Sequence, residues 1–159
     1  MTEQLSALSS TISAGVGKKA SNQFYEQWKS DALVIDKWFT IQVISALPSE
    51  ALSITQALTL HHDFNWKNPN RFRSLIGAFA ASPAAFHALD GSGYTFVSDW
   101  LIKLDVINPQ TAARMCGVFE TWARYDKKRQ TLITTQLRRI QTTPALSKDT
   151  LEIVNKILG

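Results

Sequence analysis

The sequence has one cysteine, seven glycines, five prolines and no long apolar run in 159 residues. The single cysteine, Cys116, excludes an internal disulfide and fits a reducing compartment, so we expect a cytoplasmic protein. No stretch approaches the roughly 20 apolar residues of a membrane-spanning helix, so we expect no membrane partner. Residues 1–17 have neither a basic start nor a continuous apolar stretch, and we expect no secretory signal peptide there.

The sequence also lacks the motifs of common active sites. There is no Gly-x-Ser-x-Gly elbow, and Ser92 has no base at a recognisable spacing. Cys116 lies on an apolar helix face, where a thiol usually serves as a small buried hydrophobe. Asp99 and Asp105 are most simply solvent-facing or helix-capping residues. We therefore expect no catalytic residue in this chain.

The three histidines do not form a recognisable metal motif. No His-Glu-x-x-His pair occurs. His61 and His62 are adjacent, and on a helix their side chains would point about 100° apart, which makes a shared metal ion unfavourable. His87 is distant in sequence. We expect neither a metal ion nor another cofactor within the chain.

Helical periodicity dominates what is present. Hydrophobic residues make up 45% and charged residues 19%, a globular composition, and the length suits a single domain over residues 1–159. Apolar residues recur at three and four positions, and no clean period-two alternation appears, which predicts an all-α fold. Several polar residues are placed to cap helices, either before a proline or alone: Ser82-Pro83, Asn68-Pro69, Asn108-Pro109, Asp126 (for a helix to about Gln141) and Ser147 (for Lys148 to Leu158).

An internal resemblance suggests how the helices are arranged. The two Asn-Pro pairs lie about 40 residues apart, which is a typical period of helical solenoids. We therefore predict stacked antiparallel helix pairs that build a superhelix. Gly77 and Gly117 occupy the same place in the two copies, opposite the apolar face, where we expect close helix approach. The equivalent apolar positions are Phe72, Leu75, Ile76 and Phe79 in one copy and Ala112, Met115, Cys116 and Phe119 in the other.

Two glycines mark a turn near the middle of the chain. Asp90-Gly91 would be a hairpin signal between strands, but the preceding segment 83–89 is rich in alanine and favours a helix. We expect a flexible loop over Asp90 to Gly93. It lacks the Gly-Lys-Ser/Thr ending of a phosphate-binding loop.

The net charge of +4 is concentrated in residues 114–139. A basic patch there would suit nucleic acid or an acidic surface, with Tyr125 and Trp122 near enough to stack on bases. At 3.6 residues per turn these charges spread around the helix, so we expect no nucleic-acid partner. Arg73 and Arg114 flank or oppose apolar helix faces, where a guanidinium could receive a carboxylate in a concave surface.

Several ordered motifs resemble one family. The segments are 68–80 (NPNRFRSLIGAFA), 85–94 (AFHALDGSGY), 34–39 (VIDKWF), Asn108-Pro-Gln110 with Ala113-Arg114, and 124–130 (RYDKKRQ). Together, and in the same order along the chain, these segments are similar to the C-terminal domain of bacterial aminopeptidase N, in the thermolysin-like zinc peptidases. The similarity runs from about Phe24 to the end, and covers Leu5 to Phe24 more loosely.

The resemblance implies a helical domain that closes over the catalytic domain of the same polypeptide and limits peptide access to an internal cavity. The zinc ligands of that family would lie outside this chain. Within the matched motifs, Arg73 and Arg114 look like cavity-facing arginines that steer or anchor peptide substrates. Asp90, Gly91, Gly93 and Tyr94 would lie at a domain interface.

Three hypotheses remain open from the sequence. The chain is an inactive part of an aminopeptidase, a stand-alone helical-repeat module that binds a protein or peptide, or a nucleic-acid binder through residues 114–139. The sequence gives neither the oligomeric state nor a parent enzyme's substrate preference.

Overall fold

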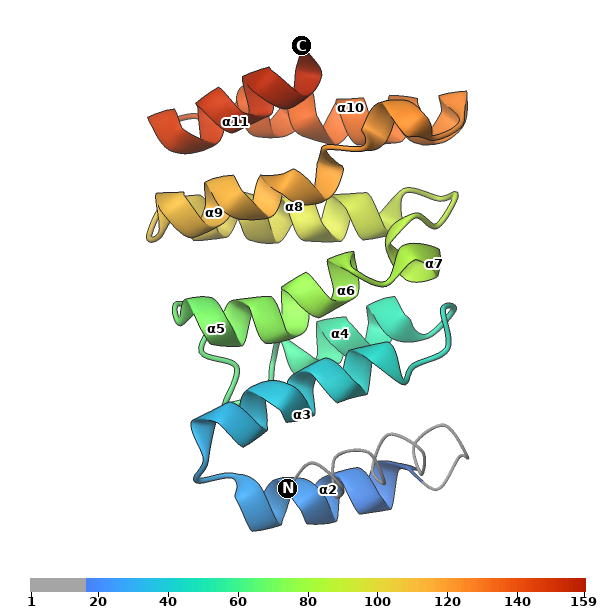
Figure 1. The fold of residues 1–159 in the computed structure, drawn as a ribbon, viewed down its shortest axis with the longest axis vertical. Coiled ribbons are helices and arrows are strands. Elements are labelled where there is room, and N and C mark those ends of the chain that lie inside the picture. The colour runs from blue at the N-terminus through green and yellow to red at the C-terminus, as the bar shows by residue number, and fades with distance from the viewer. Residues whose placement is uncertain (1–16) are drawn as a thin grey trace. The chain divides into compact units, whose positions relative to one another are not determined.

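The computed structural model describes residues 17–159, and all regular structure in this range is helical (Figure 1). The all-α prediction is confirmed. The prediction for residues 1–17 and the looser resemblance over Leu5 to Phe24 fall largely outside the described range. Within it, no helix has the length and apolarity needed to cross a bilayer.

The described residues form two compact units, 17–65 with 70–79, and 66–69 with 80–159. The prediction of a single domain over residues 1–159 stays a prediction. The first unit contains α2 (Gly17–Trp28), α3 (Ala32–Ile44) and α4 (Ala51–Leu58). A further helical run follows, of which residues 70–79 belong to this unit: α5 (Pro69–Phe72), the π-helical segment η1 (Arg73–Gly77) and α6 (Ala78–Ala80).

In the first unit, α3 is the central helix and packs on α2, α4 and η1. Asp31 begins α3, because its carboxylate accepts hydrogen bonds from the backbone N–H groups of Leu33 and Val34. Trp38 joins α3 to α2 through its indole N–H, which donates to the backbone oxygen and the hydroxyl of Ser21 at 3.1 and 3.0 Å. Phe39, Phe72, Leu75, Ile76 and Phe79 fill the core of this unit, each with no exposed surface.

The second unit contains helices joined by short turns. Its elements are α7 (Pro83–Phe86), α8 (Ser92–Asp105), α9 (Pro109–Met115), the 3₁₀ segments η2 (Cys116–Phe119) and η3 (Trp122–Arg124), α10 (Lys127–Gln141) and α11 (Lys148–Leu158). Within this unit α8 lies beside α9 and α10 beside α11, and the two antiparallel pairs are stacked, with α9 against α11 and α8 against α10 (Figure 1). The predicted stacking of helix pairs is confirmed.

The predicted helix starts are also confirmed. Helices α5, α7 and α9 begin at Pro69, Pro83 and Pro109, and α10 ends at Gln141. The side chains of Asn108, Asp126 and Ser147 accept hydrogen bonds from the N–H groups of Thr111, Arg129 and Thr150. Ser82 makes no such bond, so Pro83 alone marks that start.

Candidate functional site

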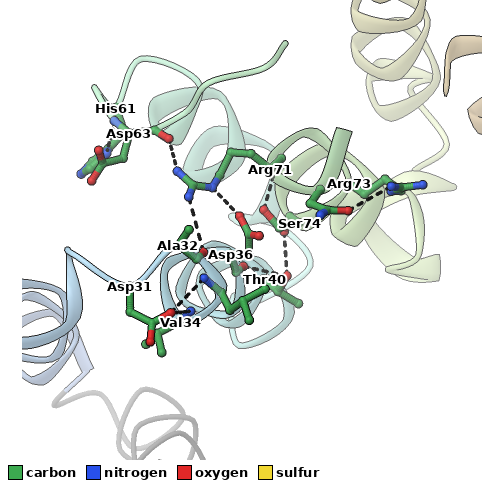
Figure 2. A network of polar contacts seen from close by, with 12 residues as sticks. Asp31, Ala32, Val34, Asp36, Thr40, His61, Asp63, Arg71, Arg73 and Ser74 are labelled. Carbon is green, nitrogen blue, oxygen red and sulfur yellow. Dashed lines mark hydrogen bonds and ion pairs between the residues drawn. The ribbon is translucent and has the colours of Figure 1, made fainter. Parts of the chain in front are cut away.

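Arg73 is the first residue of the π-helical segment η1, in which the amide of Ala78 bonds the carbonyl of Arg73, five residues back. Single π-helical turns are uncommon and frequently occur at functional sites. The Arg73 side chain is exposed and donates a hydrogen bond of 3.1 Å to the Asn70 side-chain oxygen. Figure 2 shows it leaving its helix away from the Arg71 side chain. Arg73 is thus presented on the surface by an irregular helical turn.

The structure shows a second arginine nearby that sequence reasoning did not single out. Arg71 forms an ion pair with Asp36 of α3 and donates to the backbone oxygen of Asp63 (Figure 2). Its guanidinium also lies over the Phe39 ring, 5.5 Å from the centroid. These contacts join three segments of the first unit. No short-range spacing pairs Arg71 with Asp36, so only the resemblance motif pointed to this residue.

Arg114 lies in the second unit, on the exposed side of α9. It lines a groove of about 260 Å³ between the α9–η2 run and α11. Lys156 adds a second cation to the groove and Glu120 an acid, while Ile153 and Ile157 supply apolar surface. The groove therefore offers donors for a carboxylate beside an apolar floor.

Gly117 also lines this groove, and the prediction that it allows close helix approach is wrong. A Cβ atom at Gly117 would meet no other heavy atom within 4 Å, and the residue is exposed. Close helix approach is therefore not what this glycine permits. The residues of the predicted apolar face, Ala112, Met115, Cys116 and Phe119, are all buried.

The segment Asp90 to Tyr94 is only partly the loop that the sequence suggested. Helix α8 already begins at Ser92, after Gly91 in the left-handed region at φ 75°. A Cβ at Gly93 would lie 2.5 Å from the carbonyl oxygen of Phe86, so this glycine packs directly against α7. The prediction of a flexible loop through Gly93 is wrong, because turn residues and helix starts share the same residue types.

Within this segment, Asp90 is the exposed side chain and Tyr94 is fully buried. The Asp90 carboxylate accepts hydrogen bonds from the amide and hydroxyl of Ser92 at 2.9 and 2.6 Å, and these bonds lower its pKa. The predicted interface role of Asp90, Gly91, Gly93 and Tyr94 stays a prediction. The surface they offer comes mainly from Asp90.

Tyr94 belongs to a polar cluster inside the second unit. Its hydroxyl lies 2.7 Å from His87 Nδ1, while the Tyr125 hydroxyl lies 2.9 Å from His87 Nε2. Arg129 Nε donates to the backbone oxygen of His87 at 2.7 Å. Burial raises the pKa of Tyr94 to about 12. Burial, followed by the charge of Arg129, lowers the pKa of His87. The cluster resembles a satisfied structural network more than a catalytic one.

The two adjacent histidines depart from the sequence expectation. Helix α4 ends at Leu58, so His61 and His62 lie in a turn and their rings stack with centroids 4.5 Å apart. The premise that they diverge on a helix is therefore wrong. Donor atoms of His61, His62 and Asp63 all lie within 4.8 Å of one another. Burial, and then the neighbouring His62, lower the pKa of His61.

The candidate catalytic groups of the sequence have structural roles. Cys116 is fully buried, and burial raises the pKa of its thiol to about 12. Asp105 is buried and accepts hydrogen bonds from the Ser147 amide and hydroxyl and from the Thr150 hydroxyl. Asp99 is exposed and pairs with Arg139 at 2.7 Å. Burial and these contacts give each of the three side chains a structural role that involves no chemical reaction.

Some of the basic side chains in residues 114–139 form ion pairs with acidic residues. Arg129 pairs with Asp126 at 2.7 Å, and Arg139 pairs with Asp99 at the same distance. Trp122, the candidate stacking residue, donates its indole N–H to the backbone oxygen of Ile157 at 2.8 Å. These pairings reduce the positive charge and the aromatic surface that a nucleic acid would use.

Comparison with known proteins extends this picture. A family model described as a domain of unknown function, DUF3458_C, with ARM repeats matches residues 1–159. Relatives named aminopeptidase N from Caulobacter vibrioides and Haemophilus influenzae are 41% and 42% identical over 162 and 161 residues. The aminopeptidase N of Escherichia coli is 40% identical over 162 residues.

The alignments include 99–100% of this chain but only 18–19% of each relative. The solved structure of Legionella pneumophila aminopeptidase A in complex with aspartic acid shares 34% identity, with a TM-score of 0.91. That match covers 99% of this chain and 19% of the other. The chain thus spans about a fifth of the proteins it matches. It belongs to the DUF3458_C family of ARM repeats and corresponds to the C-terminal part of aminopeptidase N.

Proposed function

We propose that this chain is the non-catalytic C-terminal domain of a zinc aminopeptidase, which closes over the catalytic domain and limits and steers the entry of peptides. The observation that carries the proposal is the match of the whole chain to about a fifth of each aminopeptidase N relative. The family resemblance implies that the zinc ligands and catalytic residues belong to the remaining part. The parent would remove N-terminal residues from peptides, in the cytoplasm.

Arg73 and Arg114 are the proposed peptide-steering residues. Both side chains are exposed, and Arg114 lines a groove that Lys156 also reaches. A guanidinium binds a carboxylate with two parallel hydrogen bonds, so such a residue suits the carboxylate of a peptide or of an acidic side chain. Asp90 would contribute to the contact with the catalytic domain of the same polypeptide.

A chimera tests the proposal most directly. The Escherichia coli relative would be prepared whole, truncated before the matching residues, and with those residues replaced by this chain. Release of a chromophore from an alanine anilide would be measured with zinc present, beside this chain alone. We expect no activity from the chain alone, and activity in the chimera well above that of the truncated relative.

Two results would contradict this function. Activity from the isolated chain would show that it is itself an enzyme. A folded chimera no more active than the truncated relative would remove the closing role and favour a stand-alone helical-repeat module that binds a protein or peptide. The Arg114 groove is the surface on which such a module would bind its ligand.

A further inference from the structure

The turn after α4 brings together two imidazoles and a carboxylate in three consecutive residues. The helix ends at Leu58, and Thr59 caps it through backbone hydrogen bonds, so His61, His62 and Asp63 are released from helical geometry. Each donor atom lies within 4.8 Å of the other two. We propose that His61, His62 and Asp63 bind one divalent transition-metal ion, with Zn²⁺ as the representative ion.

The donor set matches that class of ion. Imidazole nitrogen suits zinc, copper and nickel, and zinc sites commonly combine histidine with a carboxylate and a water molecule. Two ligands held tetrahedrally at about 2.0–2.1 Å lie roughly 3.4 Å apart. His62 Nε2 and Asp63 Oδ2 are 3.7 Å apart, already close to this spacing. The His62 side chain is 76% exposed, so it can turn to complete the site with little change in packing.

His61 is held in place by the core of the first unit. Its ring contacts three aromatic rings, those of Tyr25, Trp38 and Phe39, with centroids 5.0, 5.4 and 5.6 Å away. Its Nδ1 accepts a hydrogen bond of 3.1 Å from the Asp63 backbone amide, so the lone pair of this nitrogen faces that amide. A metal ion would compete with that single hydrogen bond for a ligand whose orientation is already fixed.

Hydrogen bonds from neighbouring residues hold the side chain and backbone of Asp63 in place. The Tyr25 hydroxyl donates to Asp63 Oδ2. It also lies 3.0 Å from His62 Nε2, so a metal ion bound to that nitrogen would replace this second contact. Arg71 donates to the backbone oxygen of Asp63 and is itself paired with Asp36, which offsets its charge (Figure 2). Hydrogen-bonded partners of this kind orient metal ligands, and a carboxylate keeps further lone pairs for an ion.

Titration calorimetry with ZnCl₂ at neutral pH tests the proposal on the tag-free chain. We expect saturable binding of one Zn²⁺ per chain, with shifts of the His61 and His62 imidazole signals in NMR spectra. Loss of an outer partner of a metal ligand weakens binding by about 10–100-fold, and loss of a ligand costs at least as much. His62→Ala and Asp63→Asn should therefore each weaken binding by about tenfold or more.

Two further variants separate the metal site from general charge effects. Glu152→Gln removes an exposed acid on α11 and should leave the affinity unchanged. Tyr25→Phe retains all three ligands and should weaken binding by about tenfold through loss of orientation. Circular dichroism checks that each variant is folded, and His62→Ala is the safest because the side chain is exposed. Absence of saturable binding, or equal affinity in His62→Ala, Asp63→Asn and the unchanged chain, would overturn the proposal, whatever the outcome of the peptidase assay.

Discussion

The hydroxyl of Thr40 on α3 donates a hydrogen bond of 2.8 Å to the backbone carbonyl of Ser74, within the π-helical segment (Figure 2). A π-helical turn disturbs the regular succession of backbone hydrogen bonds, and a side chain from another helix satisfies one carbonyl here. The irregular turn that presents Arg73 is therefore bonded to a residue more than 30 positions earlier in the chain.

Thr40→Val tests this dependence. The variant keeps the shape of the side chain but leaves the Ser74 carbonyl without its donor, which should lower the free energy of unfolding by about 1–3 kcal/mol. Thr40→Ser retains the hydroxyl and should cost less. Urea denaturation followed by circular dichroism measures both. Equal stability of the two variants would mean that the hydrogen bond is not important for this segment.

Gly93→Ala should be strongly destabilising, while Gly117→Ala should not. The new Cβ at position 93 would lie 2.5 Å from the Phe86 carbonyl oxygen, and backbone atoms cannot move aside cheaply. Overpacking of this kind costs about 1–3 kcal/mol. A Cβ at position 117 meets nothing within 4 Å, and a change there should be neutral or stabilise by up to about 1 kcal/mol. A thermal melt of the two variants makes the comparison, and similar losses at both sites would contradict it.

Asp105→Ala should destabilise the start of α11. The buried carboxylate accepts three hydrogen bonds from Ser147 and Thr150, and its removal leaves their donors unmatched in the core. Hydrogen bonds to charged groups contribute about 1.5–3 kcal/mol, so we expect a loss of about 2–3 kcal/mol. Asp149→Ala, at an exposed position in the first turn of the same helix, is the control. Native-state hydrogen exchange should show the loss concentrated in α11, and an effect no larger than that of the control would count against the capping role.

His87 should make stability depend on pH. Burial and the charge of Arg129 lower its pKa in the folded state below the ordinary value of about 6.5, so the unfolded chain binds more protons near that pH. The contribution of His87 to the free energy of unfolding is fully present above about pH 6.5. It falls as the pH drops toward the pKa of the folded state. Denaturant midpoints measured between neutral and mildly acidic pH should decline less steeply in His87→Gln. An unchanged slope would indicate that other groups cause the dependence.

Arg114→Lys should impair peptide turnover in the chimera. A lysine keeps the charge of the groove but cannot form two parallel hydrogen bonds to a carboxylate. We expect kcat/KM for peptides to fall by about tenfold, which corresponds to about 1.4 kcal/mol, with little change for the uncharged alanine anilide. Arg138→Lys, at an exposed position on α10, is the matched control. Equal losses for both substrates would contradict a role in carboxylate recognition.

Local signals accounted for much of the fold. Asp126 and Ser147 cap helices through bonds to amides three residues away, so the pattern that predicts them lies within one helical turn. The buried faces of the two helices that follow Asn-Pro pairs were predicted from the three- and four-residue spacing of their apolar side chains. The π-helical segment could not be predicted from its own residues, since the hydroxyl that bonds its Ser74 carbonyl comes from Thr40 on another helix.

The candidate sites were less accessible to sequence reasoning. His61 and His62 were assigned diverging directions because the end of α4 carries no proline or glycine to announce it. Their proximity depends on aromatic packing against α2 and α3, which neighbouring residues do not encode. The positions of Arg73 and Arg114 as exposed residues followed from helical periodicity, whereas the groove beside Arg114 requires α11, about 40 residues later.

The burial of Cys116 makes the chain well suited to site-selective chemical labelling. Thiol reagents react with the thiolate, and a buried sulfur with a pKa of about 12 presents almost none of it at neutral pH. A new cysteine at the exposed Glu152 would therefore be the reactive thiol of the folded protein. A fluorophore attached there could follow docking onto a catalytic domain without removal of the native cysteine.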